Sequence, residues 1–268
     1  MTNKLEGLRV ILTFENWPSV LLARIFDRKT GFVVYRKKGL DILIDHHGVD
    51  ENGTRKCIAT DMYRKYLPFF MLPGSARVLD LGANGGGFPL MLKIEGIDID
   101  RVVSVEMNPI TFTRLQLNLA TNLGQSAVAL NNAVCGIAEE SEILLKPNRG
   151  GTNNSMFADR VDESTPHVAV RTITLQALYD QYFKDEIVDI CKIDIESAEY
   201  ELIEGSPDDL LRKMRYIIIE LHDPPRTPAL LEKLTRLGFT EIAVPGHQPE
   251  EHGDVRALRG PTATFPTA

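Results

Sequence analysis

The sequence predicts a doubly wound α/β fold, with a mostly parallel sheet of about seven strands and an antiparallel strand at its C-terminal edge. From Arg77 onwards, short apolar runs alternate with amphipathic stretches, which is typical of parallel βαβ units with helices on both faces. A glycine-rich turn, Gly82–Gly87, follows the first apolar run, at the place where such sheets bind ligands. With 43% hydrophobic and 25% charged residues among 268, the chain can bury a sizeable core.

The core elements follow from these alternating patterns and from turn residues. The predicted strands are Arg77–Leu81, Arg101–Glu106, Ala127–Asn131, Ile187–Ile193 and Tyr216–Leu221, and the predicted helices are Phe88–Glu95, Pro109–Asn122, Glu196–Gly205 and Pro228–Leu237. Two further strands, Phe239–Val244 and Val255–Arg259, are expected to pair antiparallel at the sheet edge because a loop containing Pro245 and Gly253 separates them.

The run Leu72-Pro73-Gly74-Ser75 marks a change in pattern. We therefore expect residues 1–70 to form an N-terminal extension that caps the domain made by residues 71–268. The expected elements of the extension are strands at Arg9–Phe14, Gly31–Tyr35 and Leu40–Ile44, a helix at Pro18–Phe26 and a polar loop at Asp45–Thr54.

Charge and cysteine content restrict the partners and the compartment. The formal net charge is −7, which does not indicate a positively charged surface for binding a polyanion. We therefore expect no nucleic-acid partner. Cys57, Cys135 and Cys191 are odd in number and far apart, which fits neither a disulfide framework nor zinc-ligand spacing. The chain shows no leader pattern and no long apolar run. We expect a cytoplasmic protein without membrane insertion, compatible with a homo-oligomer.

The stretch Val78–Phe88 is the most informative part of the sequence, because glycines after a buried strand let the backbone approach a ligand. The next strand ends in Glu106, close to the spacing at which a carboxylate meets a ribose hydroxyl. The turn departs from the dinucleotide pattern, since Asn84 and Leu90 replace two of its glycines. Asp80 adds a second carboxylate, which suits a sulfonium and an ammonium better than a pyrophosphate. These features favour S-adenosylmethionine over a nicotinamide cofactor.

Four ordered blocks together resemble the FkbM family of S-adenosylmethionine-dependent methyltransferases, which have a Rossmann-like sheet. They are D-L-G-A-N-G-G-G-F from Asp80, V-E-M-N-P from Val105, R-T-I-T-L from Arg171 and K-I-D-I-E-S-A-E-Y-E-L-I-E-G from Lys192. The resemblance covers residues 60 to 222. It implies cofactor contacts from Asp80, Gly82, Asn84 and Gly85, a ribose contact from Glu106, and an adenine environment near Asn108, Asn132 and Ala133. Ala83, Met107 and Asp194 complete the expected cofactor set.

One residue departs from the family block, which usually reads D-V-E-G-A-E. Ser197 stands where glycine is expected. Because serine is easily accommodated at the start of a helix, we interpret it as a subfamily difference that concerns the substrate more than the fold.

Methyl transfer to an alcohol requires positioning and removal of the hydroxyl proton. Asp194 and Glu196 follow one buried strand and His222 follows another, so all three are expected at the carboxyl edge of the sheet. His222 has an ordinary pKa near 6.5 and is the best-suited general base of the three; Asp194 could orient it or hold the hydroxyl. The alternative is structural: the carboxylates cap a helix and His222 only hydrogen-bonds in a loop.

The polar segment Asn148–Asp162 is long for a connection in a compact domain and is a candidate active-site loop. Asn153, Asn154 and Ser155 offer it amide and hydroxyl partners for a polyhydroxylated substrate. With the family resemblance, this favours O-methylation of a sugar, glycoconjugate or glycosylated metabolite. The alternatives are a nicotinamide-dependent oxidoreductase and a non-catalytic cofactor-binding module.

Two further features of the sequence concern the site. An Asp/Glu/His cluster is compatible with a divalent metal, although no spacing in the sequence demands one. Asp61 and Tyr63 could reach over the cofactor as part of the extension, or Tyr63 could be a packing residue.

Overall fold

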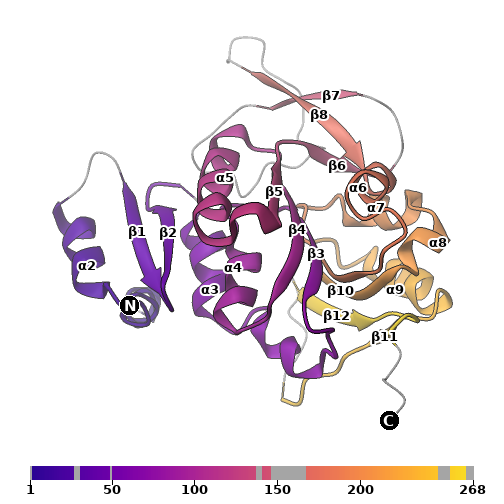
Figure 1. Cartoon of the computed structure of the whole chain (residues 1–268), viewed down its shortest axis with the longest axis horizontal. Helices are drawn as coiled ribbons and strands as arrows, with labels where there is room; N and C mark the ends of the chain where they lie inside the picture. The colour runs from indigo at the N-terminus through magenta and orange to yellow at the C-terminus, as the bar shows by residue number, and fades with distance from the viewer. Residues whose placement is uncertain are drawn as a thin grey trace.

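In the computed structural model of the protein, the described residues are 2–26, 31–48, 50–136, 141–145, 167–246 and 254–263. At their centre is a seven-stranded sheet (Figure 1). Its strands, in spatial order, are β11 (Thr240–Glu241), β12 (Asp254–Arg259), β10 (Met214–Leu221), β9 (Val188–Ile193), β3 (Ala76–Leu81), β4 (Ile99–Val105) and β5 (Ala127–Leu130). The neighbours from β10 to β5 pair in parallel, and β12 is antiparallel to both of its neighbours. The predicted doubly wound sheet with an antiparallel C-terminal edge is confirmed.

Helices cover both faces of this sheet (Figure 1). One face carries α3 (Lys56–Ala59), α4 (Gly87–Ile94) and α5 (Pro109–Leu123), and the other carries α6 (Leu175–Tyr182), α7 (Glu199–Gly205), α8 (Asp208–Leu211) and α9 (Thr227–Arg236). Polar side chains define where two of them begin. The Asn108 side chain accepts a hydrogen bond from the Ile110 amide at the start of α5, and Thr174 accepts one from Ala177 at the start of α6. Such caps satisfy amides that have no partner within the helix.

The central strands supply side chains to two hydrophobic cores, one on each face. Along β3, Val78 belongs to the core beneath α4, whereas Leu79 and Leu81 belong to the core beneath α6, α7 and α9. Every residue of β9 is buried, as expected for a parallel strand covered on both sides. Chain order reverses between β3 and β9, and ligands bind at such a switch point in open α/β sheets.

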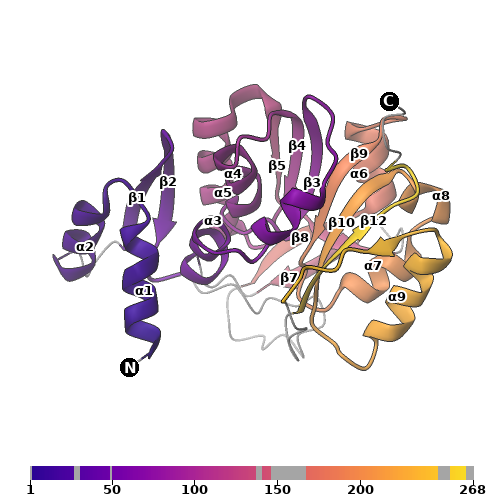
Figure 2. The same cartoon turned by 90° about the horizontal axis from the view of Figure 1, so that it is seen from below.

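The first part of the N-terminal segment forms its own layer beside α5 (Figure 2), and α3 joins the helices on the face of the main sheet. The segment consists of α1 (Thr2–Leu12), α2 (Trp17–Phe26), the hairpin strands β1 (Phe32–Lys37) and β2 (Leu40–Asp45), a π-helical turn (Glu51–Arg55), α3, and a 3₁₀ helix (Arg64–Phe69). The hairpin and the helix after Trp17 confirm the sequence prediction. Lys38 and Gly39 close the hairpin with φ of 47° and 78°, the positive values that a tight hairpin turn requires.

Two predictions for this segment are wrong. The expected strand at Arg9–Phe14 falls mainly within α1, where Leu8 and Leu12 are exposed and Ile11 is buried, a four-residue recurrence that belongs to one face of a helix. The expected loop at Asp45–Thr54 contains the π-helical turn, which continues directly into α3.

A buried ion pair ties the N-terminal segment to the main domain. Asp50 Oδ2 lies 2.6 Å from Arg114 Nε, and Asp50 Oδ1 lies 2.9 Å from Arg114 Nη2. Asp50 is fully buried and Arg114 is 3% exposed. Nearby, the Asn118 side chain accepts from the Leu43 amide and donates to the Leu43 and Gly85 carbonyls. The hairpin, α5 and the glycine turn are therefore joined by one polar network.

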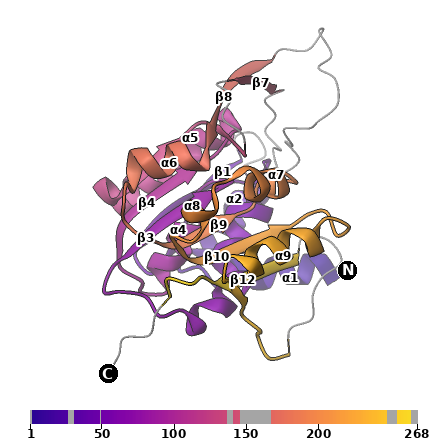
Figure 3. The ribbon, with the colours of Figure 1, turned by 90° about the vertical axis from the view of Figure 1, so that its right-hand side faces the viewer.

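A second, three-stranded sheet lies beyond the carboxyl end of the main one and was not predicted. Its order is β6 (Ala133–Cys135), β8 (Val168–Thr174) and β7 (Glu142–Leu145), and β7 and β8 project from the body (Figure 3). At the C-terminal edge, the predicted strand Phe239–Val244 is reduced to β11. None of the helices in the described ranges combines the length and apolar character needed to cross a membrane.

The Asp50–Arg114 pair provides a stability prediction. Replacing Asp50 by Asn removes the closer carboxylate of the buried guanidinium and, among the described residues, leaves only Asp45 Oδ2, at 4.0 Å from Arg114 Nη1; breaking a buried pair from one side costs about 3–5 kcal/mol. We expect Asp50→Asn to lower the free energy of unfolding by about 3 kcal/mol, measured by urea denaturation. The control is Asp41→Asn, which removes a pair with Arg36 whose side chains are 46% and 54% exposed and should cost less than about 1 kcal/mol. Equal effects of the two substitutions would contradict this account.

Candidate functional site

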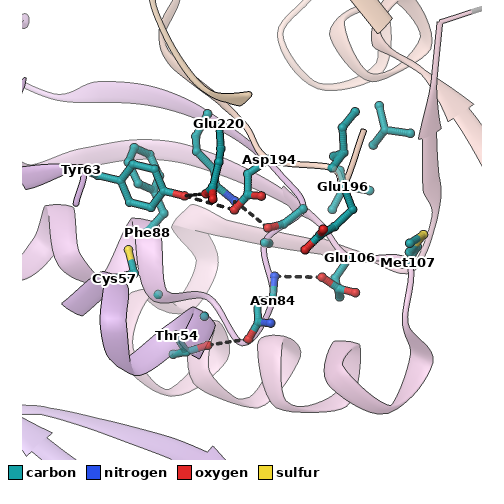
Figure 4. A pocket seen from close by; sticks show the side chains of 18 of the residues that line it. Thr54, Cys57, Tyr63, Asn84, Phe88, Glu106, Met107, Asp194, Glu196 and Glu220 are labelled. Atoms are coloured by element: carbon teal, nitrogen blue, oxygen red, sulfur yellow. Dashed lines mark hydrogen bonds and ion pairs between the residues drawn. The ribbon is translucent and has the colours of Figure 1, made fainter. Parts of the chain in front are cut away.

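A cavity of about 310 Å³ opens at the carboxyl ends of β3, β4, β9 and β10 (Figure 4). Its lining comes from the N-terminal segment as well as from the main domain. The lining residues are Gly53, Thr54, Lys56, Cys57, Met62, Tyr63, Gly82, Ala83, Asn84, Gly87, Phe88, Val105, Glu106, Met107, Asn132, Val134, Lys192, Asp194, Ile195, Glu196 and Glu220. The volume lies at the lower end of the range for cofactor and small-molecule sites.

The glycine turn after β3 forms one wall of the cavity through close backbone contacts. Gly82 has a φ of +72°, and a Cβ added there would lie 1.7 Å from the Asp194 carbonyl oxygen. Only glycine permits this approach of β3 to the end of β9. Asn84 has a φ of +49°, a conformation that Asn tolerates better than most residues. Its side-chain oxygen accepts from the Thr54 hydroxyl at 3.0 Å, which ties the turn to the N-terminal segment.

Glu106 directly follows β4, lines the cavity and contacts the glycine turn at Asn84 (Figure 4). Its two carboxylate oxygens accept hydrogen bonds from the amides of Asn84 and Asn108, at 2.9 and 2.8 Å. Each oxygen retains a second lone pair for a ligand. Burial raises the pKa of Glu106 to about 7, although the two amide hydrogen bonds oppose the shift. The carboxyl group thus changes its charge near neutral pH.

Lys192 is 4% exposed and connects several parts of the site. Its ammonium donates to the Gly82 carbonyl at 2.6 Å and to the Leu81 carbonyl at 3.3 Å. It also lies 3.4 Å from Asp80 Oδ1 and 3.2 Å from Asp194 Oδ2. Burial would lower the pKa of Lys192, but the charges of Asp194 and Asp80 raise it. The side chain is therefore a permanent cation beneath the cavity.

Carboxylates gather around His222 on the β9–β10 side of the cavity. His222 Nε2 lies 3.9 Å from Asp194 Oδ1, 3.9 Å from Glu196 Oε2 and 3.8 Å from Glu220 Oε1. Burial raises the pKa of Glu196 and of Glu220 to about 7. The Tyr63 hydroxyl, contributed by the N-terminal segment, lies 3.1 Å from Asp194 Oδ2 and 3.3 Å from Glu220 Oε2 and shares its proton between them.

The other ring nitrogen of His222 is held by a buried carboxylate. His222 Nδ1 lies 3.0 Å from Glu199 Oε1, which also accepts from the Ile195 amide at 2.8 Å. Burial would lower the pKa of His222, but the hydrogen bond to Glu199 and the charges of Asp194 and Glu196 raise it to about 9. In this environment the imidazole is cationic at neutral pH.

Most of the residues predicted for the site are brought together, although not all reach the cavity. Those that line it are Gly82, Ala83, Asn84, Glu106, Met107, Asn132, Asp194 and Glu196. The described lining leaves out Asp80, Gly85, Asn108, Ala133 and His222. Asp61, by contrast, has an 82% exposed side chain paired with Arg64. Asn153, Asn154 and Ser155, with the loop Asn148–Asp162, lie outside the described residues.

Sequence reasoning missed several residues that shape the site. Lys192 stands within an apolar strand run, where a lone lysine between buried positions is itself a signal of a buried ion pair. Glu220 is likewise a charged residue at the second-to-last position of a mostly apolar strand, β10. Thr54 and Cys57 gave no usable signal, because only the tertiary fold brings the N-terminal segment against the glycine turn.

Comparisons with known proteins identify the domain that carries this site. Residues 80–241 match the family model described as the methyltransferase FkbM domain. Methyltransferase sdnD of Sordaria araneosa is 27% identical over 191 residues, covering 60% of this chain and 73% of that protein. The AMB antimetabolite synthetase AmbE of Pseudomonas aeruginosa is 29% identical over 214 residues, covering 65% of this chain but 10% of AmbE. The crystal structure of methyltransferase FkbM from Methylobacillus flagellatus KT aligns with a TM-score of 0.48 and 15% identity, over 74% of this chain and 47% of that one.

The structure corrects our interpretation of Ser197. The helix expected from Glu196 begins at Glu199 as α7, so Ser197 is not its first residue. Glu196 and Ser197 have φ values of 52° and 80°, in the left-handed region that favours glycine. The backbone conformation at position 197 thus explains why the family has glycine there. Serine adopts this conformation only with backbone strain.

This strain leads to a prediction for Ser197→Gly. A left-handed conformation costs an ordinary residue roughly 1–2 kcal/mol, whereas the greater freedom of glycine in the unfolded chain offsets part of the gain. We expect Ser197→Gly to raise the free energy of unfolding by about 1 kcal/mol, seen as a higher midpoint in urea. Ser197→Ala keeps the Cβ and serves as the control, without a comparable gain. A lower midpoint for Ser197→Gly than for Ser197→Ala would refute the role of backbone strain.

Proposed function

The chain belongs to the FkbM methyltransferase family, and we propose that it transfers a methyl group from S-adenosylmethionine to a hydroxyl of a sugar, glycoconjugate or glycosylated metabolite. The observation that carries this proposal is the arrangement of carboxylates about one cavity. Glu106 lies on the β4 side, while Asp194 and Glu196 lie on the β9 side. Because carboxylates accept hydrogen bonds from hydroxyl groups, Glu106 is suited to bind a ribose. Asp194 and Glu196 are suited to bind an acceptor hydroxyl.

The residues around the glycine turn fit S-adenosylmethionine. Glu106 offers remaining lone pairs to both ribose hydroxyls, and Met107 and Asn132 line the adjoining space where the adenine would lie. Gly82, Ala83 and Asn84 present backbone and amide groups to the amino-acid end. S-adenosylmethionine, when bound, supplies the methyl group, and its sulfur keeps the electron pair of the broken carbon–sulfur bond. The chain's own task is to hold the acceptor hydroxyl and take its proton.

We assign proton removal to the group formed by Asp194, Glu196 and His222. Glu196 lines the cavity, whereas His222 lies behind it. We place Glu196 as the proton acceptor instead of His222, the general base expected from the sequence, because the imidazole already carries a proton at neutral pH. His222 and Asp194 would position Glu196 and the acceptor oxygen, and the His222 charge opposes the rise in the pKa of Glu196 that burial causes.

We also propose that residues 1–70 form a cap that completes the acceptor end of the site. Thr54, Cys57 and Tyr63 from this segment line the cavity beside the glycine turn and β10. A segment that covers an active site is well placed to select the acceptor. The FkbM family match favours this methyltransferase over a nicotinamide-dependent oxidoreductase. A non-catalytic cofactor-binding module remains the alternative that the activity test below addresses.

The pKa of Glu106 predicts how cofactor affinity depends on pH. If the ribose hydroxyls bind the ionised carboxylate, affinity is full above the pKa of about 7 and falls as the group is protonated below it. We expect S-adenosylmethionine to bind roughly tenfold more weakly at pH 6 than at pH 8, measured by isothermal titration. Glu106→Gln should bind weakly at both pH values with a flattened dependence. An unchanged pH dependence in this variant would remove Glu106 from the ribose contact.

Methyl transfer itself is tested with labelled S-adenosylmethionine and a panel of nucleotide sugars and glycosylated metabolites. We expect a methyl ether to form on a hydroxyl, identified by mass spectrometry. Glu196→Gln should lower the rate at least about 100-fold, the usual contribution of a general base, while S-adenosylmethionine still binds. Methylation of amines or carboxylates alone would overturn the proposed acceptor class. Transfer by the variant at the wild-type rate would overturn the role of Glu196.

A further inference from the structure

Three ligand atoms of different side chains converge beside the cavity, at the carboxyl ends of β9 and β10. They are one oxygen of Asp194, one of Glu220 and one ring nitrogen of His222, and all lie within 4.8 Å of one another. The separations of 3.9 Å and 3.8 Å between His222 Nε2 and the two oxygens are too long for hydrogen bonds. Ligand atoms around a shared ion lie about 3 Å apart, so each has to move inward by less than about 1 Å.

Each of these side chains is held in place by its other polar atom. Asp194 Oδ2 interacts with Tyr63 and Lys192, and Glu220 Oε2 interacts with Tyr63. This leaves Asp194 Oδ1 and Glu220 Oε1 directed at the same point. In the described part of the chain, no hydrogen bond is made to either of these oxygens. The two carboxylates are therefore fixed in orientation. Among the described residues, the ligand atoms Asp194 Oδ1, Glu220 Oε1 and His222 Nε2 form no hydrogen bond with one another.

Glu199 fixes the orientation of the imidazole. It is fully buried, and its Oε1 lies 3.0 Å from His222 Nδ1 while also accepting from the Ile195 amide. A carboxylate on the second nitrogen is the usual outer partner of a metal-bound histidine, because it sets the tautomer and increases the basicity of the ligand nitrogen. A bound ion would displace the Nε2 proton of the cationic imidazole, leaving Nδ1–H on Glu199 and the Nε2 lone pair directed at the point where Asp194 and Glu220 converge.

The acidic groups around His222 outnumber the described cations in contact with them. Asp194, Glu196, Glu199 and Glu220 each have an oxygen within 3.9 Å of a His222 ring nitrogen. The ammonium of Lys192 lies against only one of these four carboxylates, and it is shared with Asp80. His222 and Lys192 supply two positive charges, both shared among several carboxylates, so a divalent cation between Asp194 and Glu220 would further reduce the repulsion among these groups.

We propose that Asp194, Glu220 and His222 bind one divalent cation, with Glu196 as a further oxygen within reach. Mixed imidazole and carboxylate ligands suit ions such as Mn²⁺ or Zn²⁺ better than Mg²⁺ or Ca²⁺, which prefer oxygen alone. The binding of the ion is independent of the reaction, but its role rests on the proposed function. Beside the acceptor end, a bound cation would hold the hydroxyl oxygen and lower the pKa of that hydroxyl.

The test uses the full chain, treated with a chelator and then titrated with Mn²⁺, with free ion followed by electron paramagnetic resonance. We expect one Mn²⁺ per chain. Glu220→Gln and His222→Gln should each lower the affinity at least about tenfold, and Glu199→Gln should lower it by about 10–100-fold through the imidazole. The control Glu204→Gln removes an exposed carboxylate of α7 and should leave the affinity unchanged. Circular dichroism establishes that each variant is folded.

The outcomes separate this inference from the proposed function, because S-adenosylmethionine binding is measured on the same samples. Absence of saturable Mn²⁺ binding by the wild-type chain would overturn the cation site, whether or not the cofactor binds. Binding that is equally strong in the ligand variants would place the ion elsewhere and also overturn it. Mn²⁺ binding with the expected losses, but without methyl transfer to any hydroxyl, would retain the site and reject the proposed reaction.

Discussion

The buried ammonium of Lys192 is the interaction on which the site depends. Parallel strands β3 and β9 lie side by side at the switch point of the sheet, and their ends carry Asp80 and Asp194. Burial and the charge of Asp194 raise the pKa of Asp80, and Lys192 opposes this shift. Lys192 lies between the two carboxylates and also donates to the carbonyls of Leu81 and Gly82. The same cation thus stabilises the carboxylates and fixes the start of the glycine turn.

The cavity is assembled from parts of the chain that are distant in sequence. The N-terminal segment is attached through the buried Asp50–Arg114 pair, and this attachment brings Thr54 against the turn and Tyr63 against Asp194. Thr54 therefore holds Asn84, whose backbone amide in turn donates to Glu106. Packing of the N-terminal segment and the geometry of the proposed ribose site are physically connected, although the segment lies outside the matched family model.

The sequence predicted the sheet and the position of the site because both follow from local patterns. Buried strands read as apolar runs, and Gly82 and Glu106 stand directly after two of them. The features that the sequence did not predict depend on contacts between residues that are far apart in the chain. The strand expected at Arg9–Phe14 falls mainly within α1, because Ile11 packs inward while Leu8 and Leu12 stay exposed, a distinction that a short apolar run does not reveal. Lys192 and Glu220 were overlooked because their partners, Asp80 and Tyr63, become neighbours only when the sheet forms.

The segment from Asp194 to Glu199 explains why strain persists at this site. Within six residues it supplies three carboxylates with different tasks: Asp194 faces Lys192 and Tyr63, Glu196 faces the cavity, and Glu199 holds His222 from behind. A helix continuing directly from β9 would place successive side chains about 100° apart around one axis, and could not send these three to opposite sides of one imidazole. The positive φ values at Glu196 and Ser197 reverse the backbone before α7 begins. The strain is therefore the structural consequence of surrounding His222 with carboxylates from a single short segment.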